Sequence, residues 1–245
     1  MPGRRVVLTT GASPYLGGPC TWGPLRQAAP DFAFVEIDPL DFADASDVTE
    51  AFRQAVLCAA HDADGVVAHN TAAKPAIEAL ARMSRALPVL LLSPMLVRRR
   101  TPLLRALRFV VKTRLGRQVL TSLARSKKTR LLTDRQFLKK QILLFVDEAR
   151  ISDALVEEAV ERVADPRTAH SVERIVETIL EITNPIDPAI DAKVQRRTVL
   201  VGTSRLDRKT AARMPATILA TVRGAPMIEA PQAVAQALRE MLCVG

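Results

Sequence analysis

The stretch Asp64-Gly-Val-Val-Ala-His-Asn-Thr-Ala-Ala73 carries an apolar run directly into a series of small residues. The apolar part predicts a buried strand over 64–69, and the residues that follow predict a helix over 74–86. A strand that passes through a sharp turn into a helix is how the pattern G-x-S-x-G exposes a nucleophilic serine. Here the five positions read Ala-His-Asn-Thr-Ala, so Asn70 stands at the apex. A carboxamide cannot be deprotonated to attack an ester, and we therefore expect no covalent step there.

The segments on either side of this stretch repeat the alternation of strand and helix. Apolar runs over 5–10, 32–38 and 87–92 predict further strands, with helices between them, which is typical of a parallel sheet with crossover helices. From 95 to 190 only helical patterns occur, and strands return over 197–201 and 217–222 before a closing helix. We predict an α/β fold, a parallel sheet of about six strands with flanking helices and an inserted all-helical segment. Residues 1–95 and 196–245 form the core, and 96–195 form the helical insertion.

Several short motifs follow the predicted strands in a fixed order. They are Thr10-Gly11 with Trp22 downstream, Asp38-Pro-Leu-Asp-Phe-Ala-Asp-Ala-Ser46, Leu92-Ser-Pro94, Gly202-Thr-Ser-Arg205 and Gly224-Ala-Pro-Met-Ile-Glu-Ala-Pro231. Together with the elbow-like stretch they resemble the α/β hydrolase superfamily over essentially the whole chain. The resemblance implies that the helical insertion is a lid. It also implies that the first two strands of the family sheet are missing.

At the positions where the resemblance places the catalytic triad, this chain has residues that cannot carry out the triad chemistry. Asn70 stands for the serine, Arg205 for the acid and Gly224 for the histidine. Glycine cannot accept a proton, and a guanidinium would repel an imidazolium instead of stabilising it. Asp207 offers a shifted acid, but no histidine would be there for it to orient. The resemblance therefore predicts a chain without Ser-His-Asp hydrolysis.

A ligand pocket could persist without the triad. By resemblance, the oxyanion donors would be the backbone N–H of Thr71 and one near Gly11 or Ala12, neither of which depends on a serine. Side chains that could hold a carbonyl or carboxylate beside them are those of His69, Asn70 and Ser93. The opposing interpretation is that His69 is structural and that side chains fill the pocket.

The loop after the first strand also resembles another family. The segment 10–17 is similar to the T-G-x-x-x-G-x-G turn of short-chain dehydrogenases, with Tyr15 at the middle glycine position. Tyr15 is the only tyrosine, so the catalytic Y-x-x-x-K of that family is impossible here. Nucleotide binding is the weakest of the alternatives.

Positive charge is concentrated in the helical insertion. Between Arg98 and Lys140 fifteen basic residues face one acid, whereas the rest of the chain sums to −5. A basic amphipathic helix can lie on an anionic lipid surface or dock an acidic protein. The partner-binding candidates are Arg105, Arg108 and Lys112. Nucleic acid fits less well because the segment has only two aromatic residues and no recognised motif. The acidic stretch 147–191 could neutralise part of the charge internally.

Composition limits the remaining classes. Three scattered cysteines favour neither a disulfide framework nor a zinc site, and no segment reaches the length of a membrane span. We expect no metal, no cofactor and a cytoplasmic protein, peripheral to a membrane surface if lipid is the partner. Oligomers are compatible with the exposed sheet edge. The leading hypothesis is a non-catalytic binding or scaffolding protein. The alternative is an enzyme that uses the old pocket without a covalent intermediate, such as a lyase, cyclase or isomerase.

Overall fold

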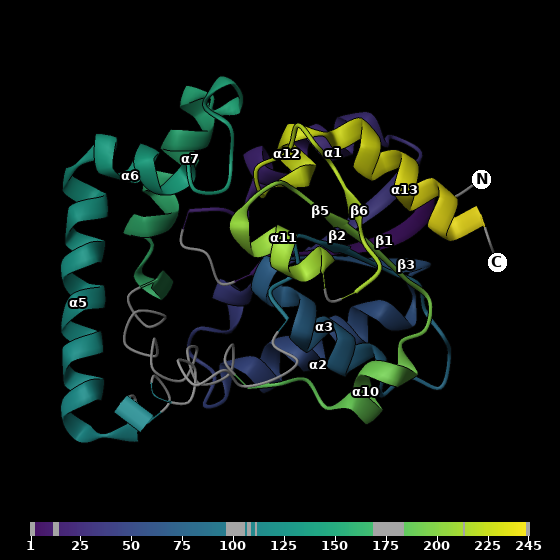
Figure 1. Ribbon diagram of the computed structural model, residues 1–245, viewed down its shortest axis with the longest axis horizontal. Coiled ribbons are helices and arrows are strands. Elements are labelled where there is room, and N and C mark those ends of the chain that lie inside the picture. Colours follow the sequence, from purple (N-terminus) through teal and green to yellow (C-terminus); the bar gives the residue numbers. More distant parts are fainter. Residues whose placement is uncertain are drawn as a thin grey trace.

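The protein is built around one parallel sheet of six strands in the order β2-β1-β3-β4-β5-β6 (Figure 1). The structure, a computed structural model, describes residues 3–11, 15–96, 106, 109–110, 112–168, 184–212 and 214–243. The strands are β1 (Arg4–Thr9), β2 (Phe32–Ile37), β3 (Gly65–His69), β4 (Val89–Leu92), β5 (Arg197–Val201) and β6 (Thr217–Ile218). All five pairings between neighbours are parallel, which confirms the predicted α/β class.

Helices cover both faces of the sheet and extend from its carboxyl end. The α-helices are α1 (Pro19–Ala28), α2 (Val48–His61), α3 (Ala73–Leu80), α5 (Arg114–Thr133), α6 (Arg135–Ile142), α7 (Asp153–Ala164), α10 (Pro188–Lys193), α11 (Arg205–Ala211), α12 (Pro226–Glu229) and α13 (Pro231–Cys243). Three short 3₁₀ turns are η1 (Pro39–Phe42), η2 (Asn70–Ala72) and η3 (Glu148–Arg150).

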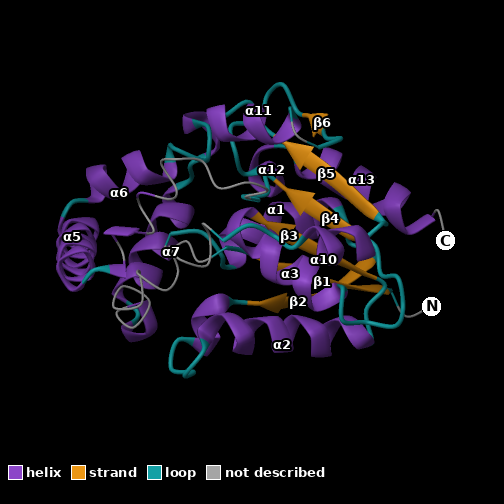
Figure 2. Ribbon diagram, turned by 60° about the horizontal axis from the view of Figure 1, so that its bottom comes forward, coloured by secondary structure: helices purple, strands orange, loops and turns teal. Residues whose placement is uncertain are grey.

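Successive strand residues enter two separate hydrophobic cores. In β4, Leu90 and Leu92 pack on the side of α1 and α13, while Val89 and Leu91 pack on the side of α2 and α3. This follows from the two-residue period of a strand, and burial on both faces explains why the central strands read as unbroken apolar runs. Figure 2 shows the strands between these helical layers.

Some element boundaries differ from those predicted. The helix after the elbow ends at Leu80 instead of Ala86, and the last strand is two residues long instead of six. Pro215 precedes the strand and cannot donate to the ladder, and the N–H of Val222 bonds the carbonyl of Leu219 in a turn that ends the strand early. The short helices α10, α11 and α12 were not predicted, because helices of four to seven residues carry little periodicity.

The helical insertion is divided in its relation to the core. Leu138 and Ile142 of α6 and Leu155 of α7 belong to the same buried cluster as the sheet residues facing α1. Helix α5 lies at the far edge of the molecule, with α6 and α7 between it and the sheet (Figure 1). The insertion therefore shares a core with the sheet through α6, α7 and Leu131 near the end of α5.

Candidate functional site

The predicted turn after β3 has the backbone of an elbow. Asn70 has a φ of +55°, and it links the buried strand β3 to η2 and then to α3. A positive φ is disfavoured for most side chains, and asparagine is among the few that tolerate it. Asn70 is half-buried, and its backbone carbonyl accepts a hydrogen bond from the N–H of Met95 at 3.0 Å. The strand, sharp turn and helix are thus present with an amide at the apex.

His69 precedes the apex and is fully buried. Its Nε2 lies 3.0 Å from the carbonyl oxygen of Gly224, and because a carbonyl can only accept, Nε2 carries the proton and donates. Burial lowers the pKa of His69 to about 4, while the hydrogen bond to Gly224 opposes part of that shift. The imidazole is therefore neutral at physiological pH and ties β3 to the loop that contains Gly224.

Ser93 ends the neighbouring strand with a second positive φ, of +42°. Its N–H donates to the carbonyl of Leu200 at 2.8 Å. Its Oγ is buried and has no hydrogen-bond partner within the described part of the chain. Two strained backbone positions, Asn70 and Ser93, therefore lie at the carboxyl ends of adjacent strands, joined through the hydrogen bond from Met95 to Asn70.

The first loop packs tightly against the elbow. A Cβ added at Gly11 would lie 2.1 Å from Oγ1 of Thr71 and 2.8 Å from its backbone nitrogen. Only glycine fits this contact, which brings together two of the segments proposed to hold oxyanion donors. Ala12, the other candidate in this loop, lies outside the described residues. The ring of Tyr15 is buried against Phe145, with centroids 6.0 Å apart, and burial raises its pKa.

Gly224 lies in a loop held by one buried carboxylate. Oε2 of Glu229 accepts from the N–H groups of Arg223, Gly224 and Ala225 at 2.9, 3.1 and 3.1 Å. Its Oε1 accepts from the N–H of Asp147 at 2.8 Å. Glu229 thus fixes both the loop and the start of η3, a role that its place between Pro226 and Pro231 did not reveal.

The helical insertion also covers Gly224. A Cβ at Gly224 would meet the carbonyl oxygen of Phe145 at 3.4 Å, an ordinary contact, but a longer side chain would have to displace the segment between α6 and η3. Arg205 begins α11, and its side chain lies outside the described residues, as does that of Asp207. The structure thus brings His69 and Gly224 into contact and leaves Arg205 without a described side-chain contact.

Helix α7 is fastened to the first loop and to η1 by charged groups. Arg162 Nη1 lies 2.5 Å from Asp38 Oδ2, with both side chains largely buried. Glu158 accepts from the N–H of Cys20 at 2.6 Å, at the start of α1. Burial and the nearby Glu158 raise the pKa of Cys20, which disfavours a reactive thiolate. The partners are more than 120 positions apart in the sequence, so no local pattern signalled these contacts.

The basic segment separates into paired and exposed parts. On α6, Arg135 pairs with Glu157, and Lys139 lies 3.7 Å from Glu148, so some of the expected internal neutralisation does occur. Lys112 is exposed. Arg105 and Arg108 lie outside the described residues. Helix α5 contains six basic residues and no acid.

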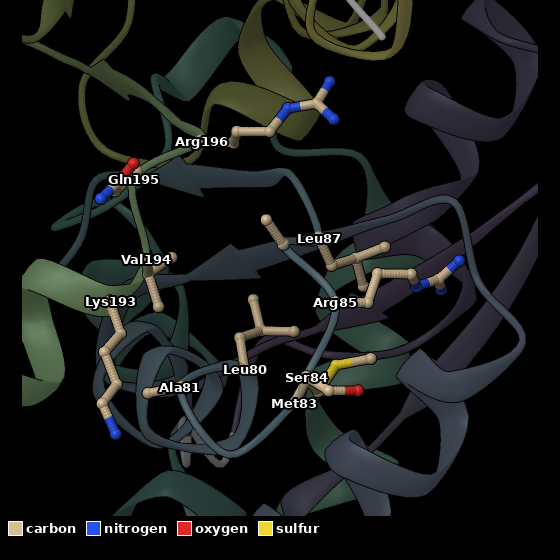
Figure 3. A pocket seen from close by; sticks show the side chains of 11 residues that line it. Leu80, Ala81, Met83, Ser84, Arg85, Leu87, Lys193, Val194, Gln195 and Arg196 are labelled. Atoms are coloured by element: carbon tan, nitrogen blue, oxygen red, sulfur yellow. The ribbon is translucent and has the colours of Figure 1, made fainter.

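One cavity among the described residues lies away from the elbow. Its volume is about 310 Å³, and it is bounded by the end of α3, the chain leading to β4 and the residues before β5. Leu80, Leu87 and Val194 point into it, whereas the charged ends of Lys193 and Arg196 point away (Figure 3). Because few polar groups converge there, this cavity does not define a polar binding site.

The described residues also bear on metal binding and on membrane insertion. No group of histidine, cysteine and carboxylate side chains among them could hold a metal ion. None of the helices described is both long and apolar enough to cross a bilayer.

Comparison with solved structures identifies the fold. A serine hydrolase of carbazole degradation, the CarC enzyme, matches with a TM-score of 0.65 and 16% identity over 99% of this chain and 92% of that chain. A meta-cleavage product hydrolase, CumD from Pseudomonas fluorescens IP01, gives a TM-score of 0.63 and 14% identity, covering 99% and 91%. A serine hydrolase from Cycloclasticus zankles, a bacterium that degrades polyaromatic hydrocarbons, gives 0.62 and 12%, covering 96% and 88%.

These matches establish that the chain has the α/β hydrolase fold, with a six-stranded parallel sheet and a helical insertion. No family model matches the sequence, and no curated protein matches it. At such low identities the similarity shows the fold alone. The chemistry depends on the residues that this chain places on the fold.

Proposed function

We propose that this protein is a non-catalytic member of the α/β hydrolase fold that binds an acidic partner through its basic helical insertion. The observation that carries the first half is the pair of residues at the elbow and in the facing loop. Asn70 holds the strained apex, and Gly224 has no side chain and accepts the hydrogen bond of His69 through its carbonyl. A nucleophile and a base within reach of each other are the minimum for covalent hydrolysis, and neither side chain can take either role.

His69 does not replace the missing base. Its Nε2 proton is committed to Gly224, and a pKa of about 4 leaves the ring a weak proton acceptor near neutral pH. The buried ring therefore supports the loop and supplies no proton transfer to position 70.

Hydrolysis of p-nitrophenyl esters tests this half of the proposal. We expect the wild-type protein and the Asn70→Ala variant to release p-nitrophenol at the same rate, which is that of the buffer plus non-specific surface groups. A burst of product equal in amount to the protein, lost in Asn70→Ala, would contradict the proposal. Asn70→Ser alone should add no turnover because position 224 still lacks a base.

The second half is supported by charge. Fifteen basic residues and one acid lie between Arg98 and Lys140, while exposed Lys112 and the acid-free α5 carry part of that excess on the surface. Complementary charge steers association and selects partners. Reversing Lys112 and Arg114 to glutamate should remove the partners that co-purify with the tagged protein from its host and leave thermal unfolding unchanged. An unaltered set of partners would refute this half.

A second candidate function rests on Ser93. A buried hydroxyl without a described partner, at a strained position beside Asn70, is suited to bind a ligand oxygen. This observation favours an enzyme of the lyase, cyclase or isomerase type that uses the strand ends without a covalent intermediate. Thermal shift measurements with a series of short carboxylates should then show stabilisation that Ser93→Ala abolishes. Equal shifts in both proteins would remove this alternative.

A further inference from the structure

Helix α5 exposes apolar side chains that a helix buried in a protein core would cover. Leu115, Val119 and Leu123 are 72%, 49% and 61% exposed. They recur every four residues and therefore form one stripe along the helix. The residues that α5 does bury are Gly116, which packs against the backbone of Val110, and Leu131, which belongs to the buried cluster that also contains Leu138 and Leu155. The predicted apolar face of this segment is thus largely open to solvent.

Exposed cations lie at the amino end of the stripe. Lys112 and Arg114 are exposed and stand on either side of Thr113, the extended residue that caps α5, immediately before Leu115. At the other end, Lys127 lies 6.0 Å from the ring of Tyr15 and Arg130 lies 4.1 Å from the ring of Phe137, so these two side chains are directed toward the rest of the protein. Phe109 is 73% exposed and adds an aromatic ring just before the helix.

The shape of this surface favours one kind of binding partner over the others. A helix of 20 residues is about 30 Å long, and α5 stands at the edge of the molecule as a convex rod (Figures 1 and 2). An exposed apolar stripe beside exposed cations fits a flat interface in which apolar side chains enter the acyl region and cations meet phosphates. Nucleic acid would use the cations but not the leucines, and an acidic protein would need an apolar surface of matching shape.

We infer that α5 docks the protein on anionic membranes, lying in the plane of the interface with Leu115, Val119 and Leu123 inserted and Lys112 and Arg114 at the lipid phosphates. This inference rests on the proposed function, because it identifies the acidic partner as a phospholipid surface. The arrangement is that of a peripheral protein, with the sheet held above the bilayer by α6 and α7.

Vesicle flotation of the full chain tests the inference, with phosphatidylcholine vesicles made with or without phosphatidylglycerol. We expect binding to the anionic vesicles alone. The charge variant Lys112→Glu/Arg114→Glu should weaken it by about 25-fold or more, since each cation near an anionic surface contributes roughly fivefold. The apolar variant Leu115→Gln/Leu123→Gln keeps every charge and should weaken binding by about tenfold or more.

A matched control reverses one lysine and one arginine elsewhere. Lys193→Glu/Arg208→Glu changes net charge by the same amount on exposed positions of α10 and α11, and its binding should stay close to wild type. The substituted side chains of α5 are exposed, and acids near its amino end suit the helix dipole. Unchanged thermal unfolding should therefore accompany every variant.

The outcomes distinguish this inference from the proposed function. If the apolar variant binds as the wild type does while the charge variant fails, the surface is purely ionic, and lipid insertion is overturned while an acidic partner stands. If the wild type ignores anionic vesicles but binds a poly-glutamate peptide, the membrane inference again fails alone. Failure with both probes overturns both proposals.

Discussion

Helices α5 and α7 belong to the same insertion but relate to the rest of the protein in opposite ways. Helix α7 buries Leu155 and Val163 in the shared core and extends Glu158 and Arg162 to the first loop and η1. Helix α5 buries Leu131 near its end but leaves Leu115 and Leu123 exposed, and it touches mainly its two neighbours in the insertion. The difference indicates that α7 serves stability and that α5 is available for interaction.

The largest expected effect compares one leucine from each helix. Leu155→Ala in α7 removes a side chain that is 2% exposed and should lower the free energy of unfolding by about 3 kcal/mol. Leu123→Ala in α5, at 61% exposed, should change it by less than about 0.5 kcal/mol. Urea denaturation of both variants measures these two changes in the free energy of unfolding. Equal losses would mean that α5 is packed as firmly as α7.

A second comparison tests the charged contacts of the α7 region. Arg162→Leu leaves the largely buried carboxylate of Asp38 without its partner and should cost about 2 kcal/mol of unfolding free energy. Arg167→Leu breaks the pairs with Asp41 and Asp165, in which the guanidinium is itself 47% exposed, and should cost less, no more than about 1 kcal/mol. Thermal denaturation distinguishes the two. A larger loss of unfolding free energy in Arg167→Leu than in Arg162→Leu would show that the pair of Arg162 with Asp38 is not the main anchoring contact.

The third effect concerns the buried His69 and grows as the pH falls. The pKa of His69 is about 4 in the folded protein, against 6.5 for an ordinary histidine, so the unfolded chain binds more protons between these values. Stability is therefore complete above pH 6.5 and should fall by about 1.4 kcal/mol for each pH unit below it, until pH approaches 4.

Two variants test whether His69 causes this dependence of the unfolding free energy on pH. His69→Gln should flatten the dependence of the unfolding free energy on pH, whereas His61→Gln, at an exposed position, should leave it intact. Urea denaturation at intervals from pH 7 to pH 5 provides the measurement. An unchanged slope in His69→Gln would show that the buried imidazole is not the group responsible.

The hydrophobic pattern predicted where the strands lie along the chain. The run ending at His69 predicted β3, and the alternation around it predicted the parallel sheet, because burial on both faces demands continuous apolar strands. The elbow at Asn70 was also visible, since small residues must follow the strand for the turn to close. The end of α3 at Leu80 and the short length of β6 could not be predicted, because the ends of helices and strands depend on tertiary packing and on neighbouring prolines.

The candidate site was readable only in part. His69, Asn70, Thr71 and Ser93 were named as pocket candidates, and the structure places these residues at the ends of adjacent strands. The contact between His69 and Gly224 joins residues 155 positions apart, and the anchoring role of Glu229 depends on four backbone N–H groups folded around it. No spacing in the sequence encodes such convergence.

The sequence by itself determined the sheet, the amide at the elbow and the excess of positive charge in the insertion, since each follows from residue type and local order. Only the tertiary structure decided that α7 is packed and α5 exposed, although both have amphipathic patterns. The physical reason is that an apolar stripe requires a cover but does not specify which surface supplies it. For α7 the covering surface is the core of this chain, and for α5 we place it in the lipid bilayer.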